Sequence, residues 1–132
     1  MSIKDLLLET SVKEIMSKNL IAADPSTTIF QIAKMMEQGV GAILVKKDSV
    51  PMGIITDRDY AIKIAVNKLS WDTSVDKVAS YPLKTINSEE TVLAASKIMT
   101  SQKIRKIAVS ENNKIVGIIT STDIVNLVAS IK

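Results

Sequence analysis

Two threonine–aspartate pairs are the residues of this sequence whose types and spacing could do chemistry. Thr56 and Asp59 follow one apolar run, and Thr120 and Asp123 follow another, each inside the sequence Gly-Ile-Ile-Thr-x-x-Asp. A threonine three residues before an acid is typical of a helix N-terminus, where the hydroxyl and the carboxylate accept hydrogen bonds from backbone amides. This capping interpretation competes with a functional one, in which the same groups bind a ligand.

The functional interpretation is a site for a nucleoside phosphate. Backbone amides at a helix N-terminus bind anions, and ligands of α/β proteins often bind where strands end. A carboxylate at such an end can accept hydrogen bonds from the hydroxyls of ribose. The basic residues are placed unequally, because Arg58 lies inside the first motif whereas Arg105 and Lys106 precede a strand of the second half. The alternative for Arg105 and Lys106 is a solvated strand entry.

Both motifs belong to an internal repeat that covers most of the chain. Residues 12–36 align with 75–99 at an offset of 63, and residues 45–59 align with 109–123 at an offset of 64. A single copy, about half the chain, buries too little surface to be more than marginally stable alone. The two copies are therefore expected to bury their sheets against each other. The expected domains are a helical lead-in at 1–11, a first repeat at 12–68, a linker at 69–74 and a second repeat at 75–132.

Each repeat predicts the same order of elements: strand, helix, two strands and helix. A short polar link between the two central strands predicts an antiparallel hairpin. The first helix of each copy should begin at Thr28, where Gln31 completes a capping box, and at Thr91. We therefore expect a mixed α+β or α/β fold with pseudo-two-fold symmetry, small packed sheets and helices outside. Trp71 is expected to anchor the linker rather than to bind a ligand.

Composition excludes several classes of site. The 132 residues contain neither cysteine nor histidine, which removes thiol catalysis, disulfides, Ser-His-Asp triads and the commonest metal ligand. A net charge of +3 and 3% aromatic residues argue against nucleic acid as a partner, and no apolar stretch is long enough for a membrane span. We therefore predict a cytoplasmic protein that is not an enzyme. Magnesium is expected only through a nucleotide phosphate, because Asp57 and Asp59 alone make a weak metal site.

The chain resembles a pair of cystathionine β-synthase (CBS) domains, known as a Bateman module, over about residues 12–128. The first copy matches the family pattern closely, whereas the second departs from it at residues 78–80 and at residues 121–122. The resemblance rests on Val-x-x-Ile-Met-Ser near Val12, Pro25 with Thr28-Ile29, Gly41-Ala42-Ile43-Leu44-Val45, and Gly-Ile-Ile-Thr-Asp-Arg-Asp.

Such modules commonly bind AMP, ADP, ATP or S-adenosylmethionine in clefts between the two repeats, and they often form dimers. The resemblance places ribose-binding aspartates at Asp59 and Asp123 and helix-cap hydroxyls at Thr56 and Thr120. The other ligand-binding residues that it implies are the polar positions Arg58, Thr85, Arg105, Lys106 and Thr122, and the apolar positions Ile21, Ala22, Ile43, Ile86 and Ile107.

Neither copy carries a complete set of these residues. Arg58 is therefore expected to serve a ligand whose ribose lies on Asp123, and Lys106 a ligand whose ribose lies on Asp59, with unequal affinities in the two clefts. The expected function is regulatory: a homodimer that senses adenosine nucleotides and passes the signal to a partner protein. The alternative is a structural or oligomerisation module with vestigial clefts, and a nucleic-acid binder ranks behind both.

Overall fold

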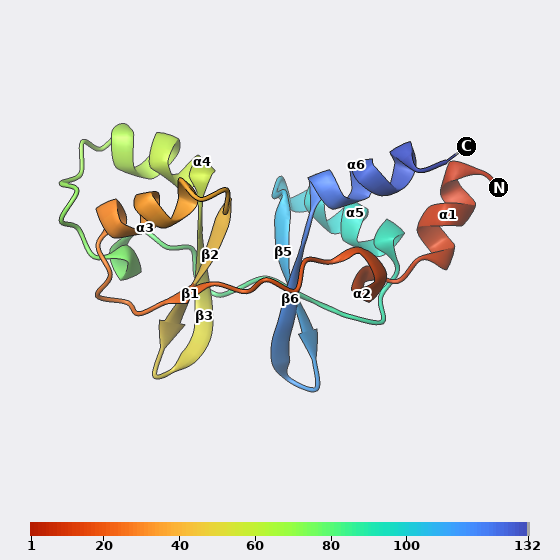
Figure 1. Ribbon diagram of the computed structural model, residues 1–132, viewed down its shortest axis with the longest axis horizontal. Coiled ribbons are helices and arrows are strands. Elements are labelled where there is room, and N and C mark those ends of the chain that lie inside the picture. Colours follow the sequence, from red (N-terminus) through yellow and green to blue (C-terminus); the bar gives the residue numbers. More distant parts are fainter. Residues whose placement is uncertain (132) are drawn as a thin grey trace. The chain divides into compact units, whose positions relative to one another are not determined.

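The computed structural model describes residues 1–131, which form two compact units. We call Ile21–Leu83 the continuous unit; the discontinuous unit joins Met1–Leu20 to the chain from Lys84 onward. Each unit contains one three-stranded sheet, seen as two separate groups of arrows in Figure 1. The mixed fold with two small sheets and helices that the sequence predicts is confirmed.

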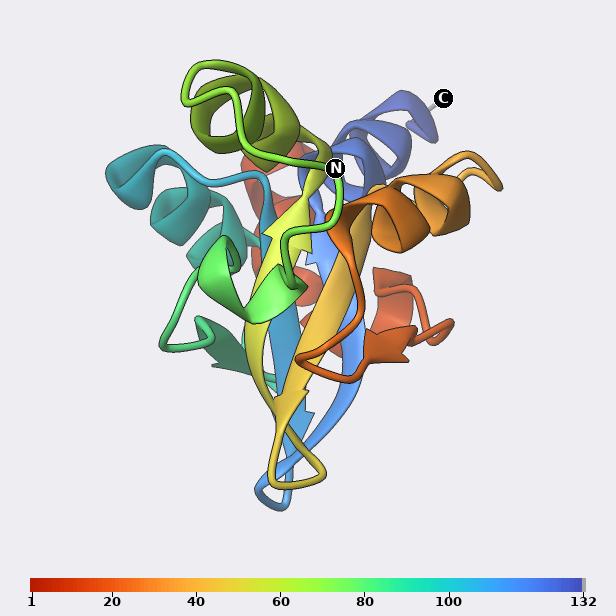
Figure 2. The same ribbon diagram turned by 90° about the vertical axis from the view of Figure 1, so that its left-hand side faces the viewer.

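In the continuous unit, β1 pairs in parallel with β2, and β2 pairs antiparallel with β3. A capping box starts α3, where the Thr28 amide donates to Gln31 Oε1 at 2.9 Å and the Gln31 amide donates to Thr28 Oγ1 at 3.1 Å. Figure 2 shows α3 and the helix after β3 at the end of the hairpin opposite its turn. The elements are β1 (Ala22–Ala23), α3 (Ile29–Met36), β2 (Ala42–Lys47), β3 (Val50–Thr56), α4 (Asp57–Asp59), the π-helix η1 (Tyr60–Ala65) and the 3-10 turn η2 (Val75–Lys77).

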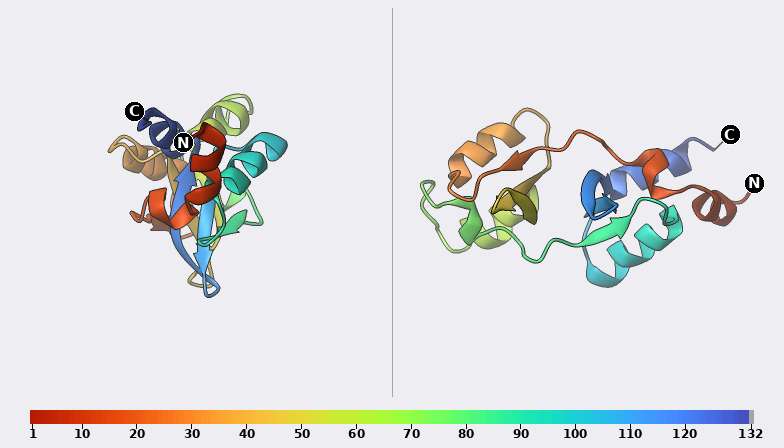
Figure 3. Two further views of the ribbon diagram at one scale, coloured as in Figure 1. Left: turned by 90° about the vertical axis from the view of Figure 1, so that its right-hand side faces the viewer. Right: turned by 90° about the horizontal axis from the view of Figure 1, so that it is seen from below.

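The discontinuous unit repeats this sheet with β4 parallel to β5 and β5 antiparallel to β6. The two N-terminal helices belong to it, because α1 contacts α5 and α2 contacts α6 and β6; Figure 3 shows α1 and α2 in red beside these elements. The elements are α1 (Ile3–Glu9), α2 (Val12–Ile15), β4 (Thr85–Asn87), α5 (Val92–Gln102), β5 (Lys106–Glu111), β6 (Lys114–Thr120) and α6 (Ser121–Ala129).

The two hairpins are tighter than their polar links suggest. Asp48 and Ser49 form the first turn with φ of 53° and 67°, and Asn112 and Asn113 form the second with φ of 52° and 63°. Positive φ at both central residues is the geometry of a two-residue type I′ turn, whose twist matches that of the flanking strands. The strands therefore extend up to these two-residue turns: β2 ends at Lys47 and β3 begins at Val50, while β5 ends at Glu111 and β6 begins at Lys114.

We call residues 12–20 and 75–83 the lead segments of the two sequence repeats. Each lead segment packs in the unit that contains the rest of the other repeat. Val12 is fully buried in the core of the discontinuous unit, and Val75 is fully buried in the core of the continuous unit. Isolated bridges join Ser17 to Ile118 and Ser80 to Ile54. The sequence repeats and the structural units therefore divide the chain at different points.

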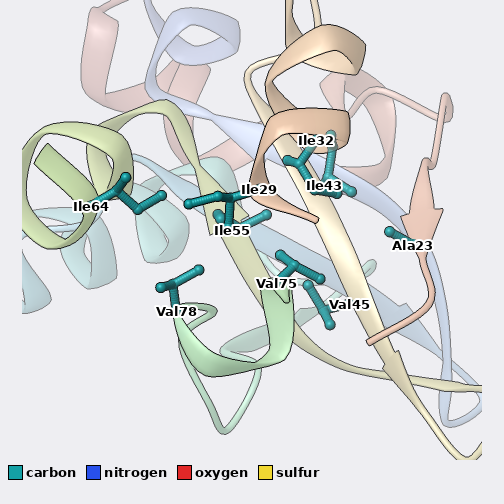
Figure 4. Close-up of a cluster of buried hydrophobic side chains, with 9 residues drawn as sticks. All are labelled: Ala23, Ile29, Ile32, Ile43, Val45, Ile55, Ile64, Val75 and Val78. Atoms are coloured by element: carbon teal, nitrogen blue, oxygen red, sulfur yellow. The ribbon is translucent and has the colours of Figure 1, made fainter. Parts of the chain in front are cut away.

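Branched aliphatic side chains fill both cores, in keeping with the scarcity of aromatic residues. In the continuous unit, Ile29 and Ile32 of α3 face Ile43 and Ile55 of the hairpin, as Figure 4 shows, and all four are fully buried. The Trp71 side chain, by contrast, is 56% exposed. The side chain is thus not a buried anchor of the linker, and the hydrogen bond at this position comes from the backbone, where the Trp71 carbonyl accepts from the Phe30 amide at 3.2 Å.

A hydrogen bond from Tyr60 connects η1 to α3 and predicts how the stability of the protein depends on pH. Its hydroxyl donates to the Ile29 carbonyl at 2.6 Å, and burial, with a smaller contribution from Asp59, raises the pKa of Tyr60 to about 12. Because the unfolded tyrosine ionises near pH 10, this group stabilises the fold below pH 10 and loses its contribution as pH rises toward 12. Tyr60→Phe should cost about 1 kcal/mol at pH 7 and flatten the fall in stability over that interval.

Urea unfolding of both proteins between pH 7 and pH 11.5 measures this difference. Tyr81→Phe is the matched control, because the Tyr81 side chain is 43% exposed and should matter less. Equal slopes for the wild-type protein and Tyr60→Phe above pH 10 would contradict the assignment.

Candidate functional site

Both Thr-x-x-Asp motifs form helix caps. The Thr56 amide donates to Asp59 Oδ2 at 2.8 Å, and the Thr120 amide donates to Asp123 Oδ2 at 2.8 Å. Each threonine side chain accepts in return from the backbone of its aspartate, which completes a capping box at α4 and at α6. The capping interpretation is thus confirmed, and capping uses one oxygen of each carboxylate.

Backbone pairing at the strand ends also uses amides that the sequence analysis expected to be free for an anion. Asp57 donates its amide to the Gly41 carbonyl at 3.3 Å, and Ser121 donates its amide to the Arg105 carbonyl at 2.9 Å. In α6 the Asp123 amide is also occupied, by Thr120 Oγ1 at 3.2 Å. An anion could use these amides only if their present hydrogen bonds broke, which gives the side chains more importance.

The two motif carboxylates have different surroundings. Asp59 is 6% exposed, and its Oδ1 lies 3.3 Å from Lys63 Nζ, so both of its oxygens are engaged. Asp123 is half-buried, and within residues 1–131 its Oδ1 has no hydrogen bond or ion pair. Only the second motif therefore offers a carboxylate oxygen to a ligand without first breaking a contact.

Strand pairing brings the basic residues of the second copy to its motif. Lys106 begins β5 and pairs with Thr120 at the end of β6, and Arg105 precedes it with an exposed side chain. Thr122 is exposed on α6, near Asp123 in the same turn. In the continuous unit, the corresponding strand start is Ala42, paired with Thr56, and the basic residue is Arg58, exposed on α4.

The apolar residues that the resemblance assigns to ligand binding lie partly in the hydrophobic cores and partly at the surface. Ile43, Ile86 and Ile107 belong to the hydrophobic cores of their units and are at most 5% exposed. Ile21 is partly buried against the core of the continuous unit. Ala22 on β1 is exposed, as is the polar Thr85 on β4. Among these residues, the ones with side chains exposed enough to contact an adenine base are therefore those on β1 and β4.

Sequence reasoning missed Lys63. The signal was available, because an acid followed four residues later by a lysine on a helix is a recognised ion-pair spacing, and Asp59 and Lys63 have it. The pocket found in the continuous unit lies elsewhere, between residues that include Lys46, Met52 and Tyr81, and it contains none of the predicted ligand residues. Within residues 1–131 no helix is long and apolar enough to cross a membrane.

Comparisons with known proteins match this architecture. The family model described as CBS domain matches the chain twice, over residues 12–65 and 75–130. An uncharacterized protein of Methanopyrus kandleri is 35% identical over 121 residues, which cover 89% of this chain and 62% of that protein. This chain thus spans less than two thirds of that relative.

Solved structures give the same result at the level of the fold. An uncharacterized conserved protein from Pyrococcus horikoshii superposes with a TM-score of 0.88 at 26% identity, covering 95% of this chain and 96% of the other. A hexameric CBS-CP12 protein from bloom-forming cyanobacteria superposes with a TM-score of 0.80 at 26% identity, covering 87% and 66%. The tandem pair expected from the sequence is confirmed, and the chain belongs to the CBS-domain family, of which it carries two copies.

Proposed function

We propose that this protein binds an adenosine nucleotide and reports its occupancy to a partner protein. The ligand is AMP, ADP, ATP or S-adenosylmethionine, which share an adenosine whose ribose presents two neighbouring hydroxyls. The protein acts as a regulatory module and not as an enzyme, and it takes up magnesium only with a nucleotide phosphate.

The observation that supports this proposal best is the arrangement around Asp123. Its Oδ2 is fixed by the Thr120 amide at 2.8 Å, which orients the carboxylate while Oδ1 remains available for a ribose hydroxyl. Arg105 and Lys106 supply positive charge at the adjoining strand start, where a phosphate in the nucleotide would be attracted. The proposal therefore pairs Asp123 with the basic residues of its own copy, in place of the crossed assignment expected from the sequence. Membership in the CBS-domain family supports the choice of an adenosine ligand over other diols.

Self-association as a homodimer is part of the same proposal. Exposed apolar side chains on the helices that follow the motifs support it. Ile62 within η1 is 50% exposed, and Val66, just after η1, is 72% exposed. Val125 on α6 is 63% exposed. Such side chains gain free energy when a second copy covers them. A ligand alters the output of such an assembly only as far as it binds one arrangement better than another.

Calorimetry and thermal unfolding with AMP, ATP and S-adenosylmethionine test the proposal. A ligand at one hundred times its Kd should stabilise the protein by about 2.7 kcal/mol. Asp123→Asn keeps a capping oxygen but removes the charge, and it should weaken binding about 10- to 100-fold, as expected for a hydrogen bond to a charged group. Asp72→Asn makes the same change of charge at an exposed residue of the linker and should leave the affinity unchanged.

Two results would contradict the proposal. The first is an unchanged unfolding temperature at millimolar concentrations of all three ligands, which would favour a purely structural or oligomerisation module. The second is equal affinity of the wild-type protein and Asp123→Asn, which would place the ligand elsewhere.

A further inference from the structure

Lys63 makes three contacts that connect the first motif to a distant part of the continuous unit. Its Nζ lies 3.3 Å from Asp59 Oδ1, donates to the Val78 carbonyl at 2.9 Å and donates to Ser80 Oγ at 3.0 Å. The Asp59 side chain is 9% exposed and that of Lys63 is 36% exposed. A lysine held by a carboxylate and two oxygens in partly buried surroundings loses much of its freedom, so the contacts fix its position.

The residues that Lys63 holds are themselves bonded to the hairpin. The Ser80 amide donates to the Ile54 carbonyl at 2.8 Å, and the Ile54 amide donates to the Ser80 carbonyl at 3.1 Å. Ser80 therefore lies against β3, three residues before the end of the continuous unit at Leu83. Through Lys63, the carboxylate of the first motif helps to hold the segment by which the chain leaves this unit.

Within residues 1–131, the second copy has no such network. The residue four positions after Asp123 is Leu127, which cannot neutralise a carboxylate. The helices differ as well, because α6 is a regular α-helix of nine residues, whereas in the first copy three α-helical residues are followed by the π-helix that carries Lys63. A π-helix is rare and often marks a position with a specific task.

We infer that Lys63 is a positioning residue that removes Asp59 from ligand recognition and assigns it to holding residues 78–80. The two Thr-x-x-Asp motifs then have different tasks: Asp123 accepts the ligand, and Asp59 fixes the exit of the chain from the continuous unit. The ligand part of this inference rests on the proposed nucleotide function, and the positioning part does not.

Hydrogen exchange without any ligand tests the positioning part. In Lys63→Met, the Ser80 and Ile54 amides should exchange on the order of tenfold faster, because a charged donor to two oxygens of this segment is lost. Asp59→Asn should have a similar effect, and the double variant should add little to either single change. Lys97→Met, at an exposed lysine of α5, is the matched control and should leave both amides unchanged.

AMP titration tests the ligand part. Asp123→Asn should lose about tenfold or more in affinity, whereas Asp59→Asn and Lys63→Met should stay within about twofold of the wild-type protein. Losses of equal size in Asp59→Asn and Asp123→Asn would overturn the assignment, as would unchanged exchange of Ser80 and Ile54 in Lys63→Met. If AMP, ATP and S-adenosylmethionine all fail to bind the wild-type protein while the exchange result holds, the nucleotide function is refuted and Asp59 keeps its positioning task.

Discussion

Removal of residues 1–20 is expected to unfold the discontinuous unit and to leave the continuous unit folded. The deleted segment supplies the fully buried Val12 and several backbone bonds. Among them, the Val12 amide donates to the Glu90 carbonyl at 2.8 Å, the Val92 amide donates to the Thr10 carbonyl at 2.9 Å, and Ser17 exchanges two bonds of 2.9 Å with Ile118.

The expected loss exceeds what a unit of this size can tolerate. Burial of a valine contributes about 1.5–3 kcal/mol, and each of the backbone bonds contributes about 1 kcal/mol. A unit of roughly seventy residues has a total stability of about 3–10 kcal/mol, so the deletion removes most of it.

Amide exchange followed residue by residue measures the result. In the truncated protein, β5 and β6 should lose protection while β2 and β3 retain it, and a synthetic peptide of residues 1–20 should restore protection to β5 and β6. If β5 and β6 stay protected after the deletion and without the peptide, residues 1–20 are dispensable for the folding of the discontinuous unit.

The second large effect is expected at Gly117, the first residue of the second motif. A Cβ at this position would lie 2.7 Å from the Ser17 carbonyl oxygen and 2.5 Å from Met16 Sδ. Because the nearest rigid group is backbone, Gly117→Ala must push the lead segment away and weaken its bonds to Ile118. We expect a loss of about 3 kcal/mol and a fall in the unfolding temperature on the order of 10 °C.

Gly53 in the first motif is the matched comparison. A Cβ there would meet mainly the Tyr81 ring, at 2.5 Å, with the Ser80 carbonyl oxygen at 2.9 Å. The Tyr81 side chain is partly exposed and can move, so Gly53→Ala should cost less, about 1–2 kcal/mol. Thermal unfolding of both variants measures the two losses of stability. A larger loss for Gly53→Ala than for Gly117→Ala would show that the contacts at Gly117 relax easily.

Local signals made much of the fold predictable from the sequence. Thr28 and Gln31 form the expected capping box, and both Thr-x-x-Asp motifs cap helices as their spacing indicates. These features depend on residues three positions apart, so the sequence contains all the information that they need. The order of strands and helices followed in the same way from apolar periodicity.

The features that sequence reasoning missed depend on distant contacts. Nothing in the residues around Val12 indicates that it packs against elements some eighty residues away, because a buried valine suits either unit equally well. The glycines of the two motifs identified the repeat, but their close approach to Ser80 and Ser17 became visible only in the structure. The contact between Lys63 and residues 78–80 is of the same kind, although its pairing with Asp59 was within reach of the sequence.

The segment of residues 1–20 has a particular history during synthesis on the ribosome. Ser17 is made about one hundred residues before its partner Ile118, which corresponds to about 5–20 s at ordinary rates of translation. All residues of the continuous unit are adjacent in the chain and are made during this interval. The side chains of Val12, Ile15 and Met16 meanwhile lack the partners that bury them in the discontinuous unit, which offers a site to chaperones. Residues 1–20 are therefore translated before the continuous unit but are among the last to reach their native contacts.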